Sequence, residues 1–385
     1  MIISLIITGV GCLSFYPAAA LNSYIAFLSA LFILATGVTL LQICSNPYAA
    51  IIGPPETASG RLNLAQGFNS LGTTIGPIVG TILIYHFFSN GQQTVESVSK
   101  TYVLYGLVFM AMALVVKLIK MPAFTNDETI ETGLTVLKNR HLLLGIFAIF
   151  FYVGSEVSVG TWIVEFLKHR SIANLTESEA GYFLSYFWGG LMIGRLMASR
   201  SLNEHLRPVR KYTSMILIAI AVFLLIYLAT SIKFIDGTFH FKMLAFSRIY
   251  VYLLYILLSI FAFAVGKGRA GRSLVIFSVI NVFLITIAIF ADGSLAMWSL
   301  LGAGLFFSIG WSNIFTLAIK DLGKYTSQGS SLLIMAIVGG AALPWIQSHI
   351  IESYGVQISF IVPVIGLLYI IFYGAYGHRI VKIST

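Results

Sequence analysis

Residues 41–80 read LQICSNPYAAIIGPPETASGRLNLAQGFNSLGTTIGPIVG and join two long apolar runs through a short polar loop. The run before the loop covers about 23–53, and the run after it covers about 62–88. A helix that crosses a bilayer needs about 20 mainly apolar residues, so each run is long enough to cross once. Similar runs follow one another along the chain. The predicted spans are 2–20, 23–53, 62–88, 101–121, 141–167, 178–198, 212–232, 244–266, 272–291, 294–319, 328–350 and 357–377.

The composition also places the chain in a membrane. Of its 385 residues, 58% are hydrophobic and 10% are charged, and the mean hydropathy is +0.92. Soluble domains carry about 25% charged residues, so this chain is too apolar for water. The net charge of +9 lies in short loops between spans and not in one patch, which argues against binding to nucleic acid.

The basic residues of the loops predict the orientation. Most of them lie in one set of alternate loops, which the positive-inside rule places in the cytoplasm. The first span then starts in the cytoplasm, and the C-terminus ends there. The longest polar loop, 122–140, is the predicted boundary between an N-terminal half (1–121) and a C-terminal half (141–385).

Polar side chains inside the spans are the best candidates for a functional site, because a charged group in mid-membrane costs roughly 2.5–3.5 kcal/mol on insertion scales. Glu156 is the acidic residue that lies well inside a span. It is therefore a candidate for binding substrate or a coupling ion. The alternative is a structural hydrogen bond to a neighbouring helix.

Two consecutive spans also carry amide side chains. Gln42 and Asn46 are four residues apart, and Gln66 and Asn69 are three apart, so each pair shares one helix face. Amides both donate and accept hydrogen bonds, which suits a neutral ligand covered in hydroxyls. The alternative is amide bonding between helices, worth about 0.6 kcal/mol per bond. Taken together, the four residues favour a polar cavity.

Trp311 and Asn313 lie mid-span beside Gly310, where they offer a flat face and a hydrogen-bonding group to a sugar ring. Ordinary packing is the alternative for both. The sequence has no P-loop, no zinc-protease motif, no serine-hydrolase motif and no His and Cys at metal-ligand spacing. It therefore predicts no enzyme, no metal site and no cofactor.

Four long motifs extend over most of the chain. They are the stretch 41–80 quoted above, AIFFYVGSEV at 148–157, YFWGGLMIGR at 186–195, and IFTLAI at 314–319 with LGKYTSQGSSLLIMAIVGGA at 322–341. These motifs closely resemble the fucose permease and glucose/galactose permease family of the major facilitator superfamily. The resemblance implies an all-α membrane protein with about twelve helices in two halves, which rock around a central sugar site.

The resemblance also bears on single residues. Gln66 and Asn69 match polar positions that line the sugar cavity in fucose-permease-like members. Gln42 stands where the proton-coupled fucose permeases carry a glutamate. Because an amide does not titrate, this difference leaves proton coupling through Gln42 in doubt, and it favours glucose, galactose or a related hexose as substrate.

The chain departs from the family pattern in two places. The segment Ile2–Leu21 resembles the family's third helix, so the first two family helices are absent and we expect the gene to continue upstream of Met1. An extra pair of spans, within about 212–266, lies between the helices that match the family's eighth and ninth. The twelve predicted spans are therefore ten family helices plus an inserted hairpin.

The predicted function is secondary active transport of a hexose, of glucose/galactose or fucose type, across the inner membrane by alternating access. The protein is predicted to act as a monomer in the lipid bilayer, with Glu156 binding a coupling proton or sodium ion. The alternatives are an N-acetylglucosamine carrier, and an inactive truncated transporter or membrane sensor. The residues predicted to bind the sugar are Gln42, Asn46, Gln66, Asn69, Glu156, Trp311 and Asn313.

Overall fold

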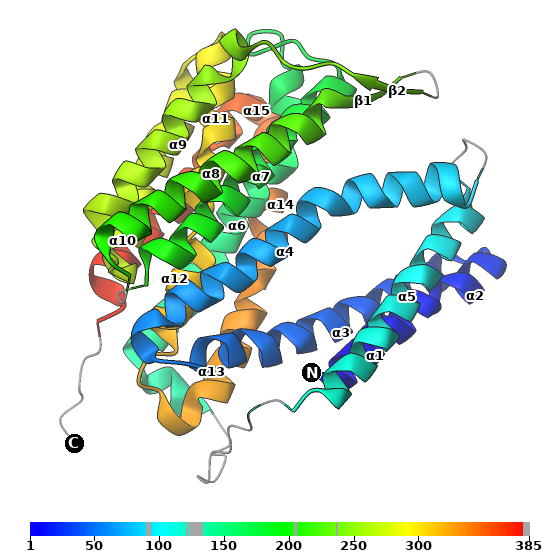
Figure 1. Ribbon diagram of the computed structural model, residues 1–385, viewed down its shortest axis with the longest axis horizontal. Coiled ribbons are helices and arrows are strands. Elements are labelled where there is room, and N and C mark those ends of the chain that lie inside the picture. The colour runs from blue at the N-terminus through cyan, green and yellow to red at the C-terminus, as the bar shows by residue number, and fades with distance from the viewer. Residues whose placement is uncertain (90–93, 121, 123–133, 204–205, 236–237, 380–385) are drawn as a thin grey trace. The chain divides into compact units, whose positions relative to one another are not determined.

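The computed structural model describes residues 1–385 apart from 90–93, 121, 123–133, 204–205, 236–237 and 380–385 (Figure 1). The chain packs as two compact units. Unit 1 holds Met1–Ile52 with Gly72–Thr129, and unit 2 holds Gly53–Leu71 with Ile130–Thr385. Helix α4 (Ala58–Thr81) gives its first part to unit 2 and its last part to unit 1.

Unit 1 is a group of long helices around α1. Helix α1 packs against α3 and α5. Helix α5 starts ahead of the predicted position 101 because a capping box begins it: Thr94 and Ser97 each accept a hydrogen bond from the other's backbone N–H. The elements are α1 (Ile2–Leu13), α2 (Phe15–Ala20), α3 (Tyr24–Ile51), the end of α4, a π-helical turn (Ile82–Phe87) and α5 (Val95–Leu118).

Unit 2 is organised around α6 (Arg140–Lys168), which packs against α7, α12, α14 and α16. Its most enclosed helix is α11, in which every residue from Ala296 to Phe307 is buried. Short 3-10 turns join several of these helices. The remaining helices are α7 (Glu177–Ser201), α8 (Pro208–Ser231), α9 (Phe246–Gly266), α10 (Ala270–Phe290), α11 (Gly293–Phe307), α12 (Gly310–Ala318), α13 (Thr326–Met335), α14 (Gly339–Tyr354), α15 (Val356–Ser359) and α16 (Ile361–Phe372).

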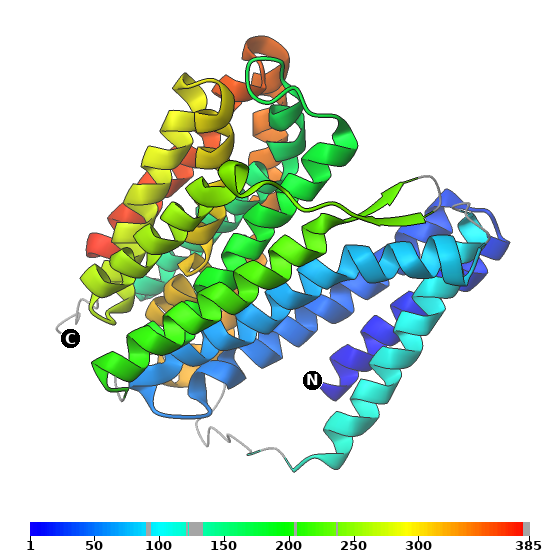
Figure 2. The same ribbon diagram turned by 45° about the horizontal axis from the view of Figure 1, so that its top comes forward.

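The extra pair of spans expected between 212 and 266 forms helices α8 and α9, and a strand pair continues them. Strands β1 (Ile232–Ile235) and β2 (Thr238–Phe241) are antiparallel, with Ile232 opposite Phe241. Figure 2 shows this ribbon extending beyond the ends of both helices. Helix α8 packs on α7, and α9 packs on α10 and α11. The hairpin therefore lies against the outside of α7, α10 and α11.

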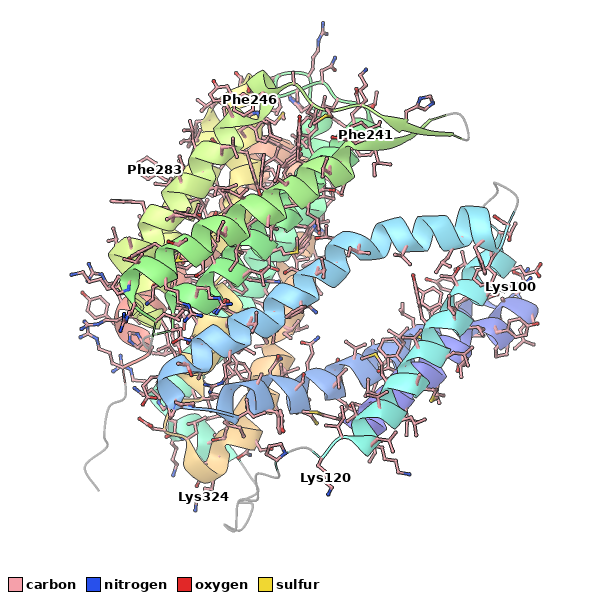
Figure 3. The ribbon with its side chains drawn as sticks, viewed as in Figure 1. Lys100, Lys120, Phe241, Phe246, Phe283 and Lys324 are labelled. Atoms are coloured by element: carbon pink, nitrogen blue, oxygen red, sulfur yellow. The ribbon has the colours of Figure 1, made fainter. Side chains whose placement is uncertain are left out.

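Helices occupy all twelve predicted spans, and ten helical segments in the described part of the chain are long and apolar enough to cross a membrane by themselves. The two others are α4 and α7, whose sequences carry more polar residues. Outward-facing aromatic rings fit a lipid environment: Phe246 and Phe283 are 68% and 70% exposed and point away from their helices (Figure 3). Lys120 and Lys324 lie outside the long helices.

Candidate functional site

Helix α6 carries a tyrosine and a glutamate one turn apart on one face. The hydroxyl of Tyr152 forms a hydrogen bond with Oε2 of the Glu156 carboxyl group. The same hydroxyl lies 2.6 Å from the backbone oxygen of Phe307. Tyr152 is buried, and the side chain of Glu156 is 13% exposed. Helix α6 therefore places a carboxyl group almost wholly inside unit 2.

Helix α7 supplies the opposite charge through Arg195, whose side chain is 8% exposed. Its Nη2 atom lies 3.5 Å from Oε1 of Glu156. Nη1 donates to Oγ of Ser70 at 2.7 Å, and Nε donates to the backbone oxygen of Ser308 at 3.3 Å. Each guanidinium nitrogen thus has an oxygen partner, which is the condition under which a protein tolerates a buried ion pair.

A helix interruption provides two of these oxygens. The predicted span 294–319 is split in the structure, since α11 ends at Phe307 and α12 starts at Gly310. The interruption leaves the backbone oxygens of Phe307 and Ser308 available, and Tyr152 and Arg195 bind them. Irregular backbone at membrane depth is tolerated where protein groups satisfy it in this way.

Two glycines make the close packing of the site possible. A Cβ atom at Gly194 would lie 2.0 Å from Oγ of Ser308, and one at Gly310 would lie 2.0 Å from the ring of Tyr152. Both distances are far below van der Waals contact. A side chain at either position would push α7 or α6 away from the interrupted helix and pull the hydrogen-bonded groups apart.

The first part of α4 presents a polar face to the same region of unit 2. Oγ of Ser59 lies 2.6 Å from Oγ1 of Thr316, and Nδ2 of Asn63 lies 3.4 Å from Oδ1 of Asn313. Ser70 accepts the hydrogen bond from Arg195 and lies 3.1 Å from the backbone oxygen of Gln66. Residues three and four apart share a helix face. Gln66, which is half-buried, therefore lies on this face between Asn63 and Ser70.

The structure places the seven predicted sugar-binding residues in both units. Gln42 is half-buried and Asn46 is buried on α3 in unit 1. Gln66 and Asn69 lie on the part of α4 that belongs to unit 2, together with Glu156, Trp311 and Asn313. Asn69 is exposed. Within unit 2, Ser70 and Arg195 link α4, which carries Gln66 and Asn69, to Glu156.

Trp311 and Asn313 differ in how their polar groups are used. Asn313 is fully buried and donates to the backbone oxygen of Ala270 at 3.2 Å, in addition to its contact with Asn63. Trp311 packs against Phe315 with ring centroids 5.7 Å apart, and its indole N–H has no hydrogen-bond partner among the described residues. Asn313 thus joins three helices, whereas Trp311 keeps a donor available.

Arg195 lies inside the predicted span 178–198 and within a family motif, but it is not among the seven residues predicted to form the site. The signal was present, because a charged residue in a membrane span is itself a candidate functional group. Tyr152 and Ser70 had no comparable signal. Their roles depend on which atoms face them after the helices pack, and neither residue type is unusual in a span.

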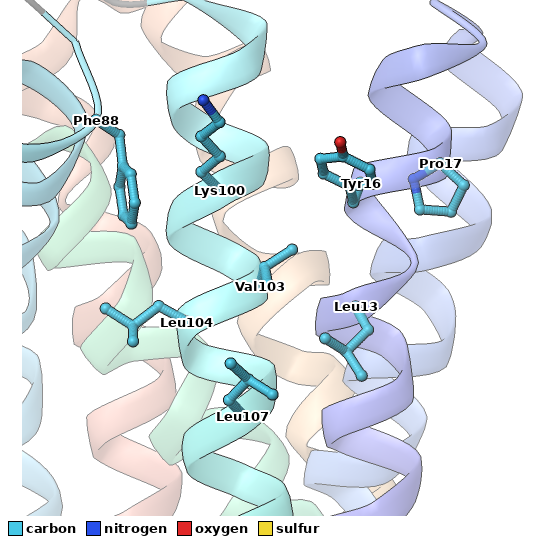
Figure 4. A pocket seen from close by; sticks show the side chains of 8 residues that line it. All are labelled: Leu13, Tyr16, Pro17, Phe88, Lys100, Val103, Leu104 and Leu107. Carbon is cyan, nitrogen blue, oxygen red and sulfur yellow. The ribbon is translucent and has the colours of Figure 1, made fainter.

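Unit 1 contains a pocket of about 460 Å³, and none of the seven predicted residues lines it (Figure 4). Its lining is mainly apolar: Leu13, Tyr16, Pro17, Phe88, Lys100, Val103, Leu104 and Leu107. Lys100 pairs with Glu96 at 2.7 Å. A sugar needs several hydrogen-bonding groups, and this lining offers few of them. The pocket therefore does not suit a polyol.

Comparison with known proteins identifies relatives of this chain. A family model described as the Major Facilitator Superfamily matches residues 1–265. The glucose/galactose transporter of Brucella abortus biovar 1 (strain 9-941) is 35% identical over 384 residues, which cover 98% of this chain and 78% of that protein. The L-fucose-proton symporter of Escherichia coli (strain K12) is 24% identical over 380 residues, covering 92% and 72%.

A crystal structure of the transporter FucP in the outward conformation has the same fold, with a TM-score of 0.72 over 98% of this chain and 82% of that chain, at 24% identity. The predicted family and the all-α membrane fold are thus confirmed, with the small ribbon β1–β2 as an addition. The protein is a multi-pass membrane transporter and not an enzyme. The chain belongs to the Major Facilitator Superfamily, and it is similar to that superfamily's glucose/galactose transporters.

Proposed function

We propose that this protein carries a hexose, of glucose/galactose or fucose type, across the bacterial inner membrane by alternating access and cation symport. The observation that supports this most is the meeting of a polar helix face with a buried ion pair. The face on α4 holds Asn63, Gln66 and Ser70, and Ser70 contacts the Arg195–Glu156 pair. The glucose/galactose and fucose-proton transporters among the relatives support the substrate class.

The proposed sugar-binding groups are mainly amides. Gln66 and Asn69 on α4 and Gln42 and Asn46 on α3 offer both donors and acceptors to sugar hydroxyls. Trp311 adds an indole N–H without a partner in the described chain. Asn313 is proposed to act indirectly, because its amide is bound to Asn63 and Ala270 and so holds α4 and α10 in place.

Glu156 is the proposed coupling group. It is a carboxyl group inside a membrane span, and the relative from Escherichia coli is named as a proton symporter. Gln42 cannot exchange a proton, so the titratable group must lie elsewhere. Glu156 pairs with Arg195 when it is ionised, and an added proton would break that pair.

Uptake of labelled glucose and galactose into inverted or right-side-out membrane vesicles tests the substrate. We expect Gln66→Ala and Asn69→Ala to lower uptake at least about tenfold, since unpaired buried hydroxyls and amides cost 1–3 kcal/mol each. Leu64→Ala is the matched control, because Leu64 is an exposed residue on the same helix. Equal uptake by all four proteins would reject the sugar-binding assignment.

A second set of measurements distinguishes the candidate sugars from one another and proton coupling from sodium coupling. Unlabelled glucose, galactose, fucose and N-acetylglucosamine compete against the labelled hexose, and the proposal requires one of the three hexoses to compete best. Uphill accumulation is then driven by a pH gradient or by a sodium gradient. If Glu156→Gln accumulates sugar as the wild type does, with unchanged ion dependence, Glu156 is not the coupling group.

A further inference from the structure

The hydroxyl of Tyr152 lies within hydrogen-bond distance of two acceptors, Oε2 of Glu156 and the backbone oxygen of Phe307. A tyrosine hydroxyl has one proton and can donate to only one of them. Both contacts are satisfied together when Glu156 is protonated. The carboxyl O–H then donates to Oη of Tyr152, and Tyr152 donates to Phe307. The geometry thus contains a place for one more proton than the ionised site holds.

The ionised carboxylate also has a partner in place. Oε1 of Glu156 faces Nη2 of Arg195 at 3.5 Å, on the other side of the carboxyl group from the tyrosine. A buried carboxyl group without any partner would be held in one charge state by the cost of desolvation. Here each charge state has its own hydrogen-bonding group, one on α6 and one on α7.

We propose that Tyr152 and Arg195 make Glu156 a proton site with two stable charge states. A change in the charge of Glu156 then shifts Arg195, and Arg195 shifts α4 through its hydrogen bond to Ser70. The inference rests on the proposed coupling role of Glu156. A proton taken from water adds to the carboxylate and is held by Tyr152. The ion pair with Arg195 is lost, and the same proton returns to water when the pair forms again.

The link to α4 follows from how Arg195 is held. In the ionised state its guanidinium group is bound by Glu156, by Ser308 and by Ser70. Loss of Glu156 removes one of the three and frees the guanidinium group to move. Ser70 is on the face of α4 that carries Gln66, so a shift of Arg195 changes the position of a proposed sugar-binding helix. Arg195 and Tyr152 are positioning residues in this scheme.

Few ionisable groups among the described residues contact Glu156 and could affect its charge. In the described part of the chain, the ionisable side chains that contact Glu156 are Tyr152 from its own helix and Arg195 from α7. The groups from α4 and α11 that complete the cluster are the neutral Ser70 hydroxyl and two backbone oxygens. A pH response of α4 can therefore be attributed to Glu156.

Hydrogen–deuterium exchange of residues 58–71 in lipid nanodiscs, measured as a protection factor between about pH 5 and 8, tests the link without using sugar. In the wild type we expect protection of α4 to fall about fivefold or more as the pH is lowered and Glu156 takes up its proton. Glu156→Gln and Ser70→Ala should give flat profiles. Ser199→Ala is the control, because the Ser199 hydroxyl donates to the backbone oxygen of Leu196 within α7, and it should keep the wild-type profile.

Two further variants test the individual roles. Tyr152→Phe keeps the ring and should move the midpoint of the profile, because one charge state loses its partner. Arg195→Lys keeps the charge but cannot reach three oxygens at once, so its profile should be flat. If Glu156→Gln does not fold, the neutral double variant Glu156→Gln with Arg195→Gln replaces it and should also be flat.

A flat wild-type profile, or a Ser70→Ala profile equal to that of the wild type, would overturn the inference. Labelled-hexose uptake by the same proteins reports separately on the proposed function. Wild-type protein that takes up no hexose but shows the pH response would reject the substrate and retain the two-state site.

Discussion

Of the three glutamate–cation pairs in the described part of the chain, Lys100–Glu96 and Arg195–Glu156 differ clearly in their surroundings. Lys100 and Glu96 lie 2.7 Å apart on one helix, with side chains 42% and 71% exposed. Glu156 and Arg195 lie 3.5 Å apart on two helices, with side chains 13% and 8% exposed. The shorter contact is the less important one, because water and salt screen an exposed pair, whereas a buried pair must be satisfied by the protein. Burial is the better guide to function here.

Breaking the buried pair should have the largest effect. Removing one partner of a buried ion pair typically costs roughly 3–5 kcal/mol, so Glu156→Gln and Arg195→Gln should each clearly lower the melting temperature of the purified protein. The double variant leaves no unpaired charge, and we expect it to recover part of the loss. Thermal unfolding in detergent measures all four proteins. Additive losses would show that the two side chains do not stabilise each other.

Disturbing the packing around the pair should have an intermediate effect. Gly194→Ala places a methyl group against Ser308 and should cost about 1–3 kcal/mol, the usual range for overpacking. Hexose uptake should fall with it, because α7 carries Arg195. Gly181→Ala on the same helix is the control, since nothing lies within 4 Å of the added atom. Equal stability of the two variants, compared by denaturant unfolding, would contradict the packing described here.

Breaking the exposed pair should have the smallest effect. Glu96→Gln removes the partner of Lys100 in a position open to solvent or lipid headgroups. We expect its melting temperature and hexose uptake to stay within experimental error of the wild type. A loss comparable to that of Glu156→Gln would mean that burial is the wrong criterion for ranking the two pairs.

The sequence was sufficient to predict the spans, because runs of apolar residues are a property of the chain alone. Two local motifs in the sequence lie outside the predicted spans. KFIDGTFHF at 233–241 alternates around an Asp-Gly pair, which is typical of a β-hairpin, and the ribbon β1–β2 forms there. Thr94 and Ser97 mark the start of α5 as a capping box, ahead of the predicted boundary.

The site was less predictable than the fold. Glu156 could be singled out because a carboxyl group in a span is costly. Its partners could not, since Tyr152, Arg195 and Ser70 come from three helices and meet only after packing. The interruption between Phe307 and Gly310 also lacks a proline, and its local signal is the weaker one of Ser308 and Gly310. Side chains from α6 and α7 bind the released backbone oxygens, and these contacts form only after packing.

The interruption has a mechanical consequence. The backbone oxygens of Phe307 and Ser308 depend on side chains from α6 and α7, and no water is present in the hydrocarbon to replace them. If α6 or α7 slid past α11 during the transport cycle, at least one bare carbonyl would face a medium that cannot hydrogen-bond to it. Helices α6, α7 and α11 must therefore move as one rigid body. The conformational change needed for transport must then take place at contacts between other helices.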